Sequence, residues 1–179
     1  MFGTKKGQAA MEYLMTYGWA LLVIIIVLAI LLIILGGYLR GTPSCTFEEA
    51  GFVCNEPAVP VMDENGVLYG AFQHAQDEPI NITGIACVEG QVASPPHWDD
   101  VNKLVPPRQL YSFGNLTTTP VSGGLQCYDA SGNRLSNMAP GSQFRGQLWI
   151  QYNYKSDAAL GYTQPRTAVA TVIANVEKA

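Results

Sequence analysis

Four cysteines are the residues of this 179-residue chain best suited to covalent chemistry. No two of them form a C-x-x-C pair, and all four follow a long apolar segment: Cys45, Cys54, Cys87 and Cys127. An even number of cysteines beyond a membrane segment favours two disulfides in an oxidising compartment. Free buried thiols are one alternative, and a metal site is another, although zinc usually needs more closely spaced ligand pairs.

The spacing of the cysteines favours one of the three possible pairings. Cys45 and Cys54 are nine residues apart around Gly51, a separation that a small loop or hairpin closes. Cys87 and Cys127, each at the end of an expected strand, then join each other. The loop-entropy model assigns about 2.5 kcal/mol of stability to the shorter bridge and about 4 kcal/mol to the longer one.

The run His97-Trp98-Asp99-Asp100 combines an imidazole, an aromatic ring and two carboxylates. Such a group could bind calcium or a sugar, but adjacent Asp residues in a Pro-rich loop are more often solvated turn formers. The sequence contains no G-x-S-x-G, no H-E-x-x-H and no Gly-rich phosphate loop. We therefore expect a protein that is not an enzyme, with no catalytic residue, no bound metal and no cofactor.

Two N-x-[ST] patterns mark candidate glycosylation sites, Asn81-Ile82-Thr83 and Asn115-Leu116-Thr117. Such patterns also arise often by chance. Asn115 is the better candidate because Gly114 and the following TTTP run place it in a loop. Asn81 lies in an expected strand and would need to face solvent.

The amino-terminal part of the chain is predicted to form a long apolar helix. No charged residue occurs between Tyr13 and Leu39. As a helix, the run from Trp19 to Leu39 would be about 31 Å long at 1.5 Å per residue, which matches the hydrocarbon thickness of a bilayer. Lys5 and Lys6 precede it, so the positive-inside rule places the amino terminus in the cytoplasm and the rest of the chain outside. An ordinary secretory signal has a shorter apolar core, so we expect the helix to remain in the mature protein.

This helix has no polar stripe along the run LLVIIIVLAILLIIL. A helix that is apolar on every face must be buried on all sides, by lipid or by other helices. One chain of this size cannot surround it, and each such side chain gains about 1.5–3 kcal/mol on burial. Outside a bilayer, many copies must therefore pack their helices together, and a non-closing contact repeated along an axis forms a filament.

The border in front of the helix carries a specific pattern: Lys5, Lys6, Gly7 and Gln8, followed by Glu12. It resembles the class III leader of archaeal type IV pilin-like proteins, in which a prepilin peptidase cuts after a glycine preceded by lysines. Cleavage after Gly7 would make Gln8 the first mature residue and Glu12 the fifth, as in that family. The family favours serine and leucine at the third and ninth mature positions, where this chain has Ala and Thr.

The resemblance implies a cleaved leader over residues 1–7, a transmembrane and polymerisation helix over 8–40 and an extracellular head over 41–179. It implies identical subunits in a helical filament as partners, together with a prepilin peptidase, a pilus assembly ATPase and its membrane platform. The chain would be a single-pass membrane protein before assembly and part of an extracellular pilus for surface adhesion afterwards. The alternatives are a minor pilin or sugar-binding pseudopilin, and a membrane-anchored surface protein that does not polymerise.

Glu12 has a physical interpretation apart from this resemblance. It lies at the entrance to a helix that faces lipid, where an ionisable residue is costly and usually has a task. After cleavage, its carboxylate could pair with the new amine of Gln8 in a neighbouring subunit. Alternatively, Glu12 rests near the lipid head groups, where the helix dipole favours a negative charge.

The head, Gly41–Ala179, has thirteen acidic and seven basic residues, so its formal charge is 7 − 13 = −6. Such a surface repels phosphate backbones, and we expect no nucleic-acid partner. Residues 80–88, 144–154 and 166–176 alternate or are β-branched as strands are, and Asn65-Gly66 and Asp129–Asn133 predict hairpin turns. These features predict an α+β fold with an antiparallel β-sandwich-like head, a distorted barrel being the other arrangement considered.

Overall fold

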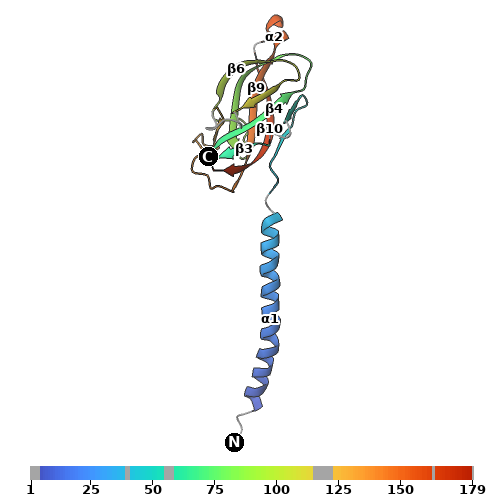
Figure 1. The fold of residues 1–179 in the computed structure, drawn as a ribbon, viewed down its shortest axis with the longest axis vertical. Helices are drawn as coiled ribbons and strands as arrows, with labels where there is room; N and C mark the ends of the chain where they lie inside the picture. Colours follow the sequence, from blue (N-terminus) through green and yellow to red (C-terminus); the bar gives the residue numbers. More distant parts are fainter. Residues whose placement is uncertain (1–4, 39–40, 55–58, 115–122, 163, 179) are drawn as a thin grey trace. The chain divides into compact units, whose positions relative to one another are not determined.

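The computed structural model describes residues 5–38, 41–54, 59–114, 123–162 and 164–178 (Figure 1). The chain divides into two compact units, Met1–Gly41 and Thr42–Ala179. The first contains helix α1 (Lys5–Tyr38), and the second is mostly β-structure. The predicted α+β class is therefore confirmed.

Helix α1 follows from an uninterrupted run of Leu, Ile, Val and Ala with no proline. Such residues supply no side-chain hydrogen bonds, so the backbone groups must be satisfied within the segment, as an α-helix does. The 34 residues of α1 correspond to a length of about 51 Å at 1.5 Å per residue.

Six strands of the second unit close into a barrel. In barrel order they are β10 (Arg166–Glu177), β3 (Val61–Asp63), β4 (Val67–His74), β8 (Leu125–Tyr128), β5 (Ile80–Glu89) and β9 (Gln143–Tyr154), which returns to β10. The predicted sandwich is wrong, because the pairings form one closed ring instead of two stacked sheets. The β10–β3 and β5–β8 pairs are also parallel, so the sheet is mixed.

Four shorter strands extend this barrel. Strand β1 (Ser44–Phe47) pairs with β10, and β6 (Asp99–Val105) pairs with β5. Strands β2 (Phe52–Cys54) and β7 (Leu110–Phe113) flank the second half of β4. Helix α2 (Lys155–Leu160) follows β9 at the end of the barrel away from the C-terminus (Figure 1).

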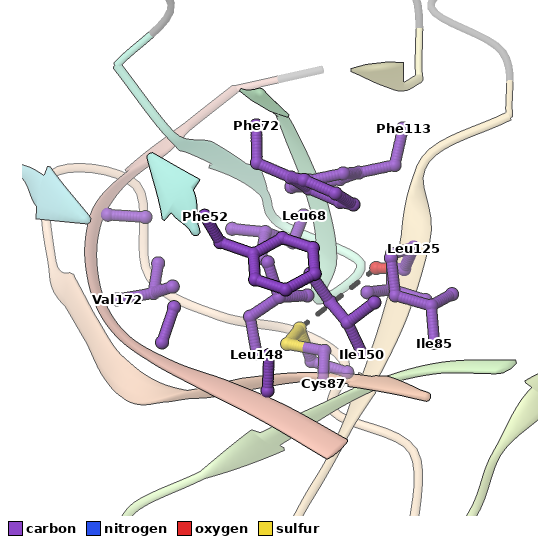
Figure 2. Packing of buried hydrophobic residues seen from close by; sticks show 14 of the residues in the cluster. Phe52, Leu68, Phe72, Ile85, Cys87, Phe113, Leu125, Leu148, Ile150 and Val172 are labelled. Atoms are coloured by element: carbon purple, nitrogen blue, oxygen red, sulfur yellow. Dashed lines mark hydrogen bonds between the residues drawn. A yellow bond between two sulfur atoms is a disulfide. The ribbon is translucent and has the colours of Figure 1, made fainter. Parts of the chain in front are cut away.

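The core fills the barrel with side chains that alternate along the long strands. In β9, Phe144, Leu148, Ile150 and Tyr152 are buried and point inward, as their spacing predicted. Figure 2 shows side chains from β2, β4, β5 and β9 meeting in this interior. Each large apolar side chain contributes about 1.5–3 kcal/mol on burial. The fully buried large members include Phe72, Phe144, Met62, Leu68, Ile80, Ile82, Leu148 and Ile150.

Two glycines occupy positions that no other residue fits. A Cβ atom on Gly146 in β9 would lie 2.2 Å from the carbonyl oxygen of Val88 and 2.5 Å from the ring of Phe144. Gly66 has φ +75° in the predicted Asn65-Gly66 turn, where its N–H donates to the carbonyl oxygen of Asp63 at 3.1 Å. Positive φ is a conformation that glycine adopts at no steric cost.

Candidate functional site

Helix α1 exposes apolar side chains all round within its own unit. Among its described large apolar side chains, the exposed fraction runs from 38% at Val23 to 78% at Met15. The stretch Tyr17–Leu35 is long and apolar enough to cross a membrane, by length and composition. A helix of this kind near the N-terminus is typical of a membrane anchor or of an export signal.

Exposure of this many apolar side chains to water is not a stable arrangement. Soluble monomers rarely expose contiguous apolar patches larger than a few hundred Å². The side chains of Leu21–Leu35 must therefore be covered by lipid or by other apolar helices. This makes α1 the part of the chain with the clearest requirement for a partner.

The residues of the predicted cleavage site lie in the first turns of α1. Lys5, Lys6, Gly7, Gln8 and Glu12 all belong to the helix, which runs without a break across the Gly7–Gln8 bond. The structure describes the backbone of these residues but not their side chains. Cleavage at this bond stays a prediction.

Two disulfides join the four cysteines of the head. Cys45 of β1 bonds to Cys54 of β2, and Cys87 of β5 bonds to Cys127 of β8. This is the pairing that the spacing favoured, and it leaves no free cysteine among the described residues. Disulfides are typical of extracellular and other oxidising compartments.

The Cys87–Cys127 disulfide joins two neighbouring strands of the barrel that share few backbone pairs. Strands β5 and β8 are paired only through Cys87 with Cys127 and Val88 with Tyr128, whereas β9 and β10 share ten register pairs. Both sulfur-bearing residues are at most 1% exposed. The covalent bond therefore lies where few backbone hydrogen bonds hold neighbouring strands together.

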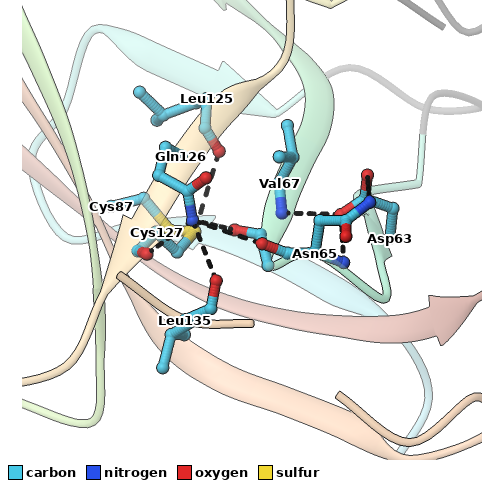
Figure 3. The surroundings of a disulfide bond; sticks show 9 residues. Asp63, Asn65, Val67, Cys87, Leu125, Gln126, Cys127 and Leu135 are labelled. Carbon is cyan, nitrogen blue, oxygen red and sulfur yellow. Dashed lines mark hydrogen bonds between the residues drawn. A yellow bond between two sulfur atoms is a disulfide. The ribbon is translucent and has the colours of Figure 1, made fainter. Parts of the chain in front are cut away.

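Gln126 in β8 fastens the loops beside this disulfide (Figure 3). Its Nε2 lies 3.0 Å from the carbonyl oxygen of Cys127 and 3.1 Å from that of Leu135. The carbonyl oxygens of Asn65 and Gly66 are 3.4 and 3.3 Å away. One amide thus links the Asn65-Gly66 turn, β8 and the chain after β8, a role that strand alternation does not reveal.

The structure describes one of the two candidate glycosylation sites. Asn81 lies in β5 between β6 and β9, and its Nδ2 donates to Oδ1 of Asn102 at 3.1 Å. The hydroxyl of Thr83 donates to the carbonyl oxygen of Gln151 at 3.2 Å. Asn81 is half-buried on the outer face of the barrel, because Ile80 and Ile82 beside it point into the core. Asn115 lies outside the described residues.

The His97-Trp98-Asp99-Asp100 run packs against the outer face of the barrel. The ring centroid of His97 is 4.6 Å from that of Tyr128, and its Nε2 is 3.3 Å from Oδ1 of Asp99. A Cβ atom on Gly84 of β5 would meet the Trp98 ring at 3.2 Å. These contacts give the aromatic residues a packing role on the outer face of β5 and β8.

The segment 90–98 covers part of the outer face of β5 and β9. Val88 and Gln147 are register partners that point away from the core, yet both are buried. Oε1 of Gln147 accepts a hydrogen bond from the backbone N–H of Val92 at 3.0 Å, and Pro95 of the same segment is buried. The segment therefore forms a small second layer of packing outside the barrel.

An ion pair fixes helix α2 at the end of the barrel. Arg166 at the start of β10 donates to both carboxylate oxygens of Asp157, and its guanidinium lies 4.6 Å from the ring centroid of Tyr154. The hydrogen bond from Arg166 lowers the pKa of the Asp157 carboxyl below its ordinary value. Oδ2 of Asp157 also accepts the backbone N–H of Tyr154 at 2.9 Å, which caps the first turn of α2.

Two of the buried side chains of the head that carry polar groups are His74 and Tyr152. His74 is fully buried, with Nε2 2.6 Å from the carbonyl oxygen of Glu78 and its ring 5.9 Å from that of Phe52. Its Nδ1 faces no hydrogen-bonding group within the described residues. Burial raises the pKa of Tyr152 to about 12, so its hydroxyl stays protonated at neutral pH. Over the described ranges, no three His, Cys, Asp or Glu side chains gather in a way that could hold a metal ion.

Comparison with known proteins does not identify a family for this chain. No protein-family model matches the chain, and no curated protein matches it either.

Proposed function

We propose that this chain is a pilin-like structural subunit of an extracellular type IV-like filament. The observation that supports the proposal best is an apolar helix exposed on every face and joined to a separate disulfide-bonded barrel. The helix needs partners to cover it, and the barrel is complete without it. A chain of this kind can exchange lipid for other copies of its own helix while the head stays folded.

Assembly through α1 follows from the energetics of its side chains. Each of them gains about 1.5–3 kcal/mol when it leaves water for an apolar surrounding. Packing against identical helices satisfies this need outside a bilayer, and a heterologous contact that repeats along an axis builds a filament. The partners in this proposal are identical subunits, which replace the membrane that holds the helix before assembly.

The amino-terminal residues have the processing role in this proposal. Lys5 and Lys6 hold the leader on the cytoplasmic side, and a prepilin peptidase cuts between Gly7 and Gln8. An assembly ATPase and its membrane platform then move the cleaved subunit into the filament. Glu12 pairs with the new amine of Gln8 on a neighbouring subunit, where the surrounding helices exclude water and strengthen the attraction.

The experiment is amino-terminal sequencing and intact-mass measurement of the protein in filaments sheared from the cell surface. We expect the chain to begin at Gln8 and to carry two disulfides. A chain that begins at Met1 and stays in the membrane fraction would instead be an anchored surface protein. Cleaved protein present in filaments at a small molar fraction would be a minor subunit.

The role of Glu12 is tested by Glu12→Ala, with Glu89→Ala as the matched control. Glu89 is exposed at the end of β5, so this control removes one acidic side chain from the surface of the head. We expect Glu12→Ala to insert into the membrane normally and to yield far fewer filaments, while Glu89→Ala assembles as wild type does. Wild-type filament yield from Glu12→Ala contradicts the assigned pairing.

A further inference from the structure

The chain enters the head through an edge strand. Helix α1 ends at Tyr38, and the first strand of the head is β1, Ser44–Phe47. Within the described residues this strand pairs only with β10, over four register positions from Ser44 with Ile173 to Phe47 with Ala170. Any pull from the helix on the head therefore acts first on a strand held by one neighbour.

Noncovalent contacts that secure β1 are few. After the strand, the N–H of Glu48 donates to the carbonyl oxygen of Val169 at 3.0 Å. Oε2 of Glu49 accepts the N–H of the same Val169 at 2.8 Å. The Phe47 ring is 5.4 Å from that of Phe52 in β2. The same ring is 5.8 Å from that of the buried Phe72 in β4. The rest of the strand is more open, because Ser44 and Thr46 are exposed, so β1 can open locally while the barrel stays folded.

The Cys45–Cys54 disulfide is the one covalent bond that holds β1 on the described head. It joins β1 to β2, which in turn pairs with the second half of β4. Cys45 and Cys54 are half-buried, whereas Cys87 and Cys127 are at most 1% exposed. A small thiol in solution can therefore reach the first disulfide without unfolding the barrel, but cannot reach the second one in this way.

We propose that the Cys45–Cys54 disulfide is a redox-sensitive clasp that sets the length of the tether between α1 and the head. An external dithiol opens the clasp: one thiolate attacks a cystine sulfur and forms a mixed disulfide, which the second thiol then resolves. Two electrons and two protons pass to Cys45 and Cys54, which become thiols, and the dithiol becomes a cyclic disulfide. Strand β1 is then held only by its edge contacts.

The effect on the tether follows from the chain between the two cysteines. The bridge holds their Cα atoms 5.7 Å apart across a sequence separation of nine. Nine fully extended residues span about 30 Å at 3.3–3.6 Å per residue. With the clasp open and β1 detached, the tether can therefore lengthen by up to about 25 Å. The clasp acts equally on a helix held by lipid or by a filament, so its failure and that of the proposed function are separable.

The test uses the full chain in detergent micelles, with dithiothreitol as the dithiol and iodoacetamide to trap free thiols. Peptide mapping should show alkylated Cys45 and Cys54 at a dithiothreitol concentration about tenfold or more below the one that exposes Cys87 and Cys127. Hydrogen exchange of β1 amides should then be faster by a factor of about ten or more, while the amides of the paired strands β5 and β9 exchange at an unchanged rate. The double variant Cys45→Ser/Cys54→Ser should show the same exchange without any reductant.

Two outcomes would overturn the clasp. Alkylation of all four cysteines at one dithiothreitol concentration means that the first disulfide has no separate accessibility. Unchanged β1 exchange in both the reduced protein and the double variant means that the edge contacts hold the strand without the disulfide.

Discussion

Removal of the Gln126 amide should destabilise the head by an amount that its geometry limits. Four carbonyl oxygens lie 3.0–3.4 Å from Nε2, but the amide has only two hydrogens to donate. A hydrogen bond of this kind contributes about 0.5–1.5 kcal/mol net. We therefore expect Gln126→Ala to lower the free energy of unfolding by about 1–3 kcal/mol.

A second substitution at this position separates donation from packing. Gln126→Glu keeps the shape of the side chain but places an oxygen where Nε2 stood, facing carbonyl oxygens that can only accept. At neutral pH the ionised carboxylate is repelled by these dipoles, whereas the protonated acid can still donate once. The folded-state pKa of the introduced carboxyl is therefore raised. The variant should approach wild-type stability below the unfolded-state pKa of Glu and lose that stability as pH rises through the folded-state value.

The assay is urea unfolding of the full chain in detergent, followed by tryptophan fluorescence and with both disulfides intact. Gln91→Ala is the control, because Gln91 is exposed in the segment 90–98. The reasoning is refuted if Gln126→Ala and Gln91→Ala unfold with the same free energy. A Gln126→Glu variant that is equally stable at pH 4 and pH 7 would contradict the assignment of Nε2 as a donor.

Two further predictions concern other parts of the head. Cys87→Ala/Cys127→Ala should lower the free energy of unfolding by about 4 kcal/mol on the loop-entropy model, and Cys45→Ala/Cys54→Ala should lower it by about 2.5 kcal/mol. Equal losses in urea titrations would count against the larger contribution of the Cys87–Cys127 bridge. Because Arg166 lowers the pKa of Asp157 in the folded state, wild type should lose stability as pH falls below about 4 through that lowered value. Arg166→Gln should show a shallower decrease in thermal scans between pH 6 and pH 2, and an unchanged slope would refute this.

Local patterns predicted the strands of the head better than their arrangement. Strands β5, β9 and β10 lie where alternation and β-branched residues placed them, and Asn65-Gly66 forms its turn. The sandwich was wrong because alternation says only that one face of a strand is buried. Barrel closure depends on the short parallel pairs β10–β3 and β5–β8, which join segments far apart in sequence.

The candidate sites show the same limit in physical terms. The cysteine spacing indicated loops that a bridge could close, because that argument needs only chain separation. Side-chain contacts such as Gln126 with Leu135, or Arg166 with Asp157, depend on how loops fold back over the barrel. The alternation of polar and apolar residues along a strand does not indicate them. Burial of Gln147 on the outer face was equally hidden, since it results from the segment 90–98 lying across the strand.

The central place of β10 has a consequence for the order of events during synthesis. This strand pairs with β1, β3 and β9, yet the ribosome makes it after all of them. Until Arg166–Glu177 has emerged, β1 has no partner and the ring of six strands cannot close. Contacts of such long sequence separation form slowly, because distant segments must first meet. Pairs such as β5–β9 and β3–β4 can form before then, but the barrel of the head is completed only by the last strand to be made.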